Sequence, residues 1–177
     1  MRFALVLCLL AVTAPACDSP GAGPSLPSGA HWIAYTESAP GPIGCGTRPT
    51  IVAGTGIDDL REKVVAACSR PSICNQSPAG CWQDLQDQPG YVYIAVLIMP
   101  ACTATTKDDV AESPTAIYVV HWTGHAQGVC NMMLALPPYR LFVVSRSGLH
   151  AGTVKVELQL QTDGSSTETA DTEVELR

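Results

Sequence analysis

The sequence predicts a mainly β domain with one short helix (α+β), arranged as an antiparallel β sandwich or a barrel-like sheet and crosslinked by disulfides. Three observations predict this fold. Apolar β-rich runs recur along the chain, only one segment has convincing helical periodicity, and eight cysteines occur in 177 residues. So many cysteines are typical of an exported protein, because disulfides persist in oxidising compartments.

The N-terminus has the features of an export signal. Met1-Arg2 is a short basic start, residues 3–12 are an unbroken apolar run, and Ala14-Pro15-Ala16 is a small-x-small cleavage pattern. We therefore expect residues 1–16 to be a secretory signal peptide, which is too short to span a bilayer as a helix. An extracytoplasmic location follows from this interpretation.

Cys17 comes directly after the cleavage pattern and resembles the lipid-attachment cysteine of bacterial lipoproteins. Loss of Cys8 with the signal and lipidation of Cys17 leave an even set of six cysteines. The alternative is an ordinary secreted or periplasmic protein, in which Cys17 pairs with another chain or stays free. We expect a lipid on Cys17 to be the chain's link to a membrane.

The expected domain organisation follows from composition. Residues 17–30 form the lipidated cysteine and a tether, because nine of the 13 residues from 18 to 30 are Pro, Gly or Ser. Residues 31–161 form a single β-rich domain, and residues 162–177 form an acidic polar tail or a terminal hairpin strand. The chain has 16 acidic and 10 basic residues, a balance that disfavours nucleic acid as a partner.

Residues 57–68 are the predicted helix. Ile57, Leu60 and Val64 recur at helical spacing on one face and Cys68 extends it. Arg61, Glu62 and Lys63 are expected to face water. Thr55, three residues before Asp58, indicates a start similar to a capping box.

The most apolar strand is predicted at residues 91–99, where both alternating faces are apolar, as expected of a central strand covered on each side. Residues 153–161 alternate most cleanly, so that strand should have one wet face. In the polar segment that follows, a hairpin return would pair Val174 and Leu176 with this strand. The other expected strands are 31–36, 47–52, 116–122, 130–136 and 139–145.

The cysteines are interpreted as disulfide partners. Cys68, Cys74 and Cys81 have the spacing C-x5-C-x6-C, which differs from the short knuckles of zinc sites. Six cysteines allow 15 pairings, so the connectivity stays open. We expect no metal and no cofactor. The predicted disulfide cysteines are Cys45, Cys68, Cys74, Cys81, Cys102 and Cys130.

Histidines and carboxylates are the only candidates for chemistry. His121 and His125 flank a Thr-Gly turn and, with His150, could bind a transition metal, but solvated loop histidines are the favoured interpretation. A polar loop after Cys102 is expected to carry solvated carboxylates. Those carboxylates are Asp108, Asp109 and Glu112.

Three aromatic residues are the candidate binding residues: Trp82 beside Cys81, and Tyr118 and Trp122 at a strand end. Aromatic residues on rigid segments are frequent anchors of interfaces. The alternative is that they cover the ends of a β core.

The order of strand, short helix, long apolar strand and later strands resembles the PrcB-type protease-complex subunits. The resemblance covers roughly residues 51–146 and is carried by Ile57 to Leu60, Tyr91 to Met99, Cys130 and Pro138-Tyr139-Arg140-Leu141. It implies a non-catalytic envelope protein that binds another protein, such as a protease.

We therefore expect a non-catalytic, lipid-anchored, extracytoplasmic protein-binding or assembly module of the bacterial cell envelope, with a protein partner. One alternative is a protease-inhibitor-like protein. The other is an extracytoplasmic hydrolase or metal-dependent enzyme, which would require His121, His125 and Asp108 or Asp109 to lie close together.

Overall fold

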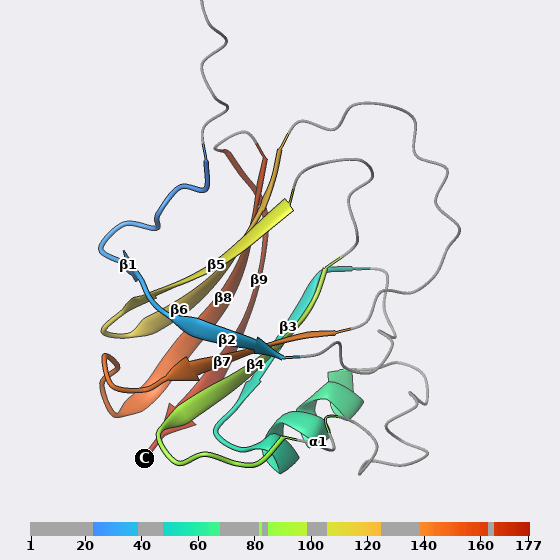
Figure 1. Ribbon diagram of the computed structural model, residues 1–177, viewed down its shortest axis with the longest axis vertical. Coiled ribbons are helices and arrows are strands. Elements are labelled where there is room, and N and C mark those ends of the chain that lie inside the picture. The colour runs from blue at the N-terminus through green and yellow to red at the C-terminus, as the bar shows by residue number, and fades with distance from the viewer. Residues whose placement is uncertain are drawn as a thin grey trace, which may run out of the picture.

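The computed structural model describes residues 23–38, 48–67, 82, 85–98, 106–124, 139–162 and 165–177. This part of the chain is mainly β, with two sheets and one helix (Figure 1). The predicted signal peptide, Cys17, the strand expected at 130–136, His125 and every predicted disulfide cysteine lie outside the described residues.

The five-stranded sheet has the order β1-β5-β6-β8-β9. Its neighbours pair antiparallel except for β6 and β8, which are parallel. The prediction of a wholly antiparallel sandwich is therefore wrong for this pair. The physical reason is a crossover: the chain leaves β6, passes through β7 in the other sheet and only then enters β8. The strands are β1 (His31–Trp32), β5 (Thr106–Ser113), β6 (Ala116–Thr123), β8 (Gly152–Thr162) and β9 (Ser165–Leu176).

The four-stranded sheet has the order β2-β7-β4-β3 and is antiparallel throughout. Its strands are β2 (Tyr35–Ser38), β7 (Arg140–Ser145), β4 (Tyr91–Leu97) and β3 (Thr50–Gly54). The short segment between β1 and β2 carries the chain from one sheet to the other. The two sheets remain separate, so the barrel-like alternative is not the one observed.

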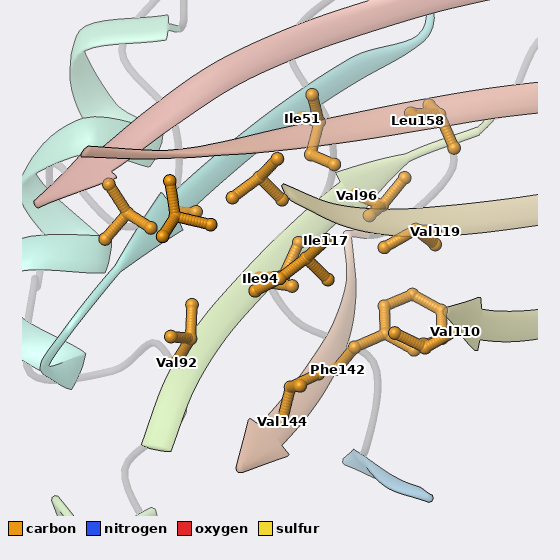
Figure 2. Close-up of a cluster of buried hydrophobic side chains, with 14 of the residues drawn as sticks. Ile51, Val92, Ile94, Val96, Val110, Ile117, Val119, Phe142, Val144 and Leu158 are labelled. Atoms are coloured by element: carbon orange, nitrogen blue, oxygen red, sulfur yellow. The ribbon is translucent and has the colours of Figure 1, made fainter. Parts of the chain in front are cut away.

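An apolar core fills the space between the two sheets (Figure 2). Ile94 of β4 and Phe142 of β7 face Ile117 and Val119 of β6, and all four side chains are fully buried. Tyr35 of β2 packs against Phe142 with 5.5 Å between ring centroids. This layer is the interior of a two-sheet sandwich.

A second apolar layer lies on the other side of the four-stranded sheet, beneath helix α1 (Ile57–Ala67). The helix buries Ile57, Leu60 and Val64 against residues such as Tyr93 and Leu97, as its periodicity predicts. Strand β4 is therefore covered on both faces, which confirms the predicted central strand. No helix among the described residues is long and apolar enough to cross a membrane.

The start of the helix differs from the predicted capping box of Thr55 and Asp58. Asp59 accepts a hydrogen bond from the Thr55 N–H at 3.3 Å, and Asp87 accepts one from the Ile57 N–H at 2.5 Å. Asp58 instead pairs with Arg61. Asp87 lies 30 residues further along the chain, so no local pattern reveals it as a cap.

The polar loop predicted after Cys102 is also wrong, because residues 106–113 form strand β5. The side chains of Asp108 and Glu112 point into the sandwich rather than to water, as the burial of both shows. Apolar periodicity did not predict this strand because polar side chains from other strands contact these two carboxylates: His121 and Arg140 contact Asp108, and His31 lies 3.5 Å from Glu112.

The polar segment after β8 was predicted to be a tail or a hairpin strand. In the structure it forms strand β9, which is the hairpin alternative. It pairs antiparallel with β8, placing Val154 opposite Val174 and Gly152 opposite Leu176. Val174 and Leu176 join the inter-sheet core. Although most of the strand is polar, these two buried side chains identify the face of β9 that points into the sandwich.

Part of the predicted tether docks on the five-stranded sheet. The side-chain amide of Gln161 accepts the Ser25 N–H at 2.7 Å and donates to the Ser25 carbonyl at 2.9 Å. Gln161 is only 2% exposed. Residues before His31 are therefore attached to the sheet, because this side chain satisfies both backbone groups of Ser25.

Candidate functional site

A buried polar cluster ties the two sheets together at one end of the sandwich. Asp108 of β5 contacts the His121 Nδ1 atom of β6 at 2.7 Å through one carboxylate oxygen and Arg140 of β7 through the other. Arg140 also donates through Nε and Nη2 to Glu37 of β2, at 3.0 and 2.7 Å. The cluster thus joins four strands from both sheets.

The cluster is shielded from solvent at its centre. The side chains of Asp108 and His121 are 6% and 7% exposed. Burial alone lowers the pKa of Arg140, but the hydrogen bonds and charges of Glu37 and Asp108 outweigh it and raise that pKa. Arg140 is consequently a fixed cation between two carboxylates.

Tyr35 completes the cluster by donating its hydroxyl to the Asp108 carbonyl at 2.6 Å. Burial is the largest cause of its raised pKa, followed by the charges of Asp109 and Asp108. Tyr35 therefore stays a neutral donor across the neutral pH range, and it anchors the backbone of β5 to β2.

Sequence reasoning placed His121 and Asp108 in solvated loops, and the structure corrects both. They occupy directly opposed positions on neighbouring strands. In a hydrolase triad, a carboxylate that is bonded to one imidazole nitrogen orients the histidine. However, the second oxygen of Asp108 is already committed to Arg140, so the arrangement also has the form of a structural ion pair.

Glu112 and the other described histidines do not join this cluster. Glu112 is buried near the opposite end of β5 and lies 3.5 Å from Nε2 of the exposed His31. The His150 N–H donates to the carbonyl of Pro114. Among the described residues no group of three or more His, Cys, Asp or Glu side chains is placed to hold a metal ion.

An aromatic surface lies on the outer face of the five-stranded sheet. Trp32 of β1 is 41% exposed and pairs with Ala111, which in turn pairs with Tyr118 of β6. Trp122, four residues along β6, is on the same face and partly exposed. Trp32 was not among the predicted binding residues, because a two-residue edge strand has too little periodicity to reveal its outward face.

Trp82 belongs to the other side of the molecule. It is buried in the layer beneath helix α1, where its carbonyl accepts hydrogen bonds from Arg61 and from the Leu85 N–H. For Trp82 the structure therefore agrees with the alternative in which the residue covers the core. The structure therefore brings Tyr118 and Trp122 together with Trp32 and separates Trp82 from them.

Charged side chains on β5, β8 and β9 border the aromatic surface. Glu157 pairs with Lys155 at 3.0 Å, and Asp109 pairs with Lys107 at 2.7 Å. Three further carboxylates on the same face of β9 are exposed. They are Asp171, Glu173 and Glu175. Lys107 and Lys155 are thus matched by carboxylates, and the described side chains of this face have a negative net charge.

A groove of about 400 Å³ lies on the outer face of the four-stranded sheet, beside the helix. Its floor is the cross-strand row of Thr36, Val143 and Tyr93. One wall is the segment of residues 85–88, which Tyr93 holds by accepting the Gln88 N–H at 2.7 Å. No local sequence pattern predicts this groove, because its lining comes from four separate segments.

Comparison with known proteins gives no relative for this chain. No protein-family model, no curated protein and no solved structure matches it.

Proposed function

We propose that this protein is a non-catalytic, extracytoplasmic binding or assembly module whose protein partner docks on the outer face of the five-stranded sheet. The observation that carries the proposal is Trp32. It and Leu26 are the large apolar side chains that the described residues expose, at 41% and 42%. An exposed tryptophan on a paired strand costs little entropy to dock, because its backbone is already fixed.

Three features support docking at this face. Tyr118 extends the aromatic surface inward from Trp32, with the small Ala111 at the paired position between them. The hydrogen-bonded strands below form a rigid support. The carboxylates of β9 form one border, so the partner is expected to present a neutral or cationic surface.

We also propose that a lipid on Cys17 anchors the module to a membrane. Ser25, the docked residue, is only eight residues after Cys17, and eight residues span at most about 28 Å when fully extended. The domain would therefore stay close to the membrane surface. The intact mass of the purified protein tests this: an acyl adduct on Cys17 is expected, and an unmodified Cys17 thiol would contradict the anchor.

Photocrosslinking in the cells that produce the protein tests the docking face. A photoreactive residue replaces Lys155 on the outer face, and in a second variant it replaces Glu62, which is exposed on the helix. A single defined adduct is expected from position 155, and it should disappear when Trp32→Ala is added. Equal adducts from both positions, or no adduct from position 155, would overturn the proposal.

One contact favours a second candidate function, an extracytoplasmic hydrolase. The 2.7 Å contact of Asp108 with the Nδ1 atom of His121 would orient the ring so that Nε2 acts as a general base. Under this hypothesis His121→Gln abolishes hydrolysis of a panel of ester and peptide substrates without unfolding the chain. A wild-type protein inactive on the whole panel would exclude this candidate.

A further inference from the structure

We infer that the groove on the four-stranded sheet is a binding site for a neutral glycan. The groove is separate from the aromatic surface proposed above as the protein-docking face, because the two lie on the outer faces of different sheets. Its volume of about 400 Å³ falls in the usual range of about 300 to 1,000 Å³ for small-ligand sites.

The lining carries the groups that recognise hydroxyls. Thr36 and Ser38 contribute hydroxyl groups, and Gln86 and Gln88 contribute side-chain amides. Within the described part of the chain these four side chains make no hydrogen bond to another residue. Hydroxyl and amide groups both donate and accept, as sugar hydroxyls do, so each can match a hydroxyl in either direction.

The groove also offers an aromatic surface. Tyr91 is half-buried in the lining, and Tyr93, two residues further along β4 on the same face, is buried in the floor. The hydroxyl of Tyr93 is occupied by the Gln88 N–H and the Gln86 carbonyl, so this ring serves as a fixed support. An aromatic ring beside polar side chains suits a pyranose, which has apolar C–H faces and a polar rim.

Charge excludes most ionic ligands from this site. Glu37 is the single ionisable acidic or basic side chain known to line the groove in the described residues, and Arg140 already pairs with it. No described lysine or arginine lines the groove to attract a phosphate or a carboxylate. The ligand that fits is therefore uncharged.

The wall of the groove is formed in advance of binding. Tyr93 of the floor holds the backbone of residues 86 and 88, and Asp87 between them holds the first N–H of helix α1. Segment, sheet and helix are thus linked by hydrogen bonds. Binding would therefore cost little free energy for ordering this wall. This matters because hydroxyl groups make only weak contacts with proteins.

Titration of the full chain with maltotriose and with tri-N-acetylchitotriose, followed by calorimetry and saturation-transfer NMR, tests the site. At least one trisaccharide is expected to bind, and Tyr91→Ala should weaken it at least 10-fold. Gln88→Ala should weaken it also without touching the core, because that side chain is exposed. The control is Glu62→Ala, at an exposed position of helix α1 outside the groove lining, and it should leave the affinity unchanged.

Three results would overturn the inference: no binding of either trisaccharide at millimolar concentration, binding that Tyr91→Ala and Gln88→Ala leave unchanged, or equally strong binding of inorganic phosphate. The protein-docking proposal fails by other readouts. Loss of the crosslink at position 155 tests the five-stranded sheet, whereas these titrations test the four-stranded one.

Discussion

The two sheets of this protein differ in how they meet solvent. The four-stranded sheet is covered on both faces, by the inter-sheet core on one and by helix α1 on much of the other. The five-stranded sheet buries its inner face and leaves most of its outer face polar or aromatic. Strand β4 shows the first pattern in a run of buried residues, and β8 shows the second in its alternation of buried and exposed ones.

The two sheets therefore have different roles: the four-stranded sheet supports the fold, and the five-stranded sheet exposes side chains to solvent. Burial on both faces places the four-stranded sheet between two apolar layers of the described core. A sheet buried on one face can carry side chains whose identity the core does not constrain. Trp32 and the carboxylates of β9 are of this kind, and this is why the five-stranded sheet is the better candidate for protein docking.

The largest expected effect concerns the cluster that joins the two sheets. Asp108→Ala leaves Arg140 and His121 without their shared carboxylate, so the free energy of unfolding should fall by about 3 to 5 kcal/mol. Asp109→Ala, the next residue, removes only a pair with the exposed Lys107 and should cost less than about 1 kcal/mol. Urea unfolding measures both. Equal losses would mean that the buried cluster does not join the sheets energetically.

The second effect concerns the covered outer face of the four-stranded sheet. Leu60 is fully buried between helix and sheet, so Leu60→Ala should lower the free energy of unfolding by about 2 to 5 kcal/mol. Glu62→Ala, on the exposed side of the same helix, should change it by about 0.5 kcal/mol or less. A cost for Leu60→Ala as small as the control would show that the helix does not cover this sheet.

The third effect concerns the N-terminal segment on the five-stranded sheet. Gln161→Ala removes both hydrogen bonds to Ser25, each worth about 0.5 to 1.5 kcal/mol. Hydrogen exchange of the Ser25 amide should accelerate and proteolysis within residues 23–30 should increase. The control is Gln86→Ala, which changes an exposed glutamine in the segment before β4. Unchanged protection of Ser25 in Gln161→Ala would contradict the docking of this segment.

The smallest effect is a pH dependence on the open face. Burial raises the pKa of Glu157, but hydrogen bonds from Gln159 and Lys155 outweigh it and hold that pKa below its ordinary value of 4.5. A depressed pKa in the folded state means that this carboxylate stabilises the fold above about pH 4.5 and loses its contribution as the pH falls through the folded-state value.

Glu157→Gln should therefore lower the free energy of unfolding by less than about 1 kcal/mol at pH 7 and by a smaller amount at pH 3. Denaturant unfolding at the two pH values checks this. A difference between wild type and variant that grows on acidification would contradict the assigned sign of the shift.

The sequence by itself determined the parts whose side chains report their own surroundings. Helix α1, the doubly covered β4 and the one-sided β8 were predicted because apolar spacing is a direct consequence of burial. The mainly β class followed from the same signal. The predicted export signal, lipid site and disulfides depend on residues outside the described part and remain predictions.

The tertiary structure alone decided the features that depend on partners distant in the chain. Strand β5 was mistaken for a loop because His121 and Arg140, not apolar neighbours, make the burial of Asp108 tolerable. The cap from Asp87, the clamp from Gln161 and the parallel pairing of β6 with β8 have the same origin. A polar residue's surroundings are set by the groups that satisfy its hydrogen bonds, and local sequence does not say where those groups are.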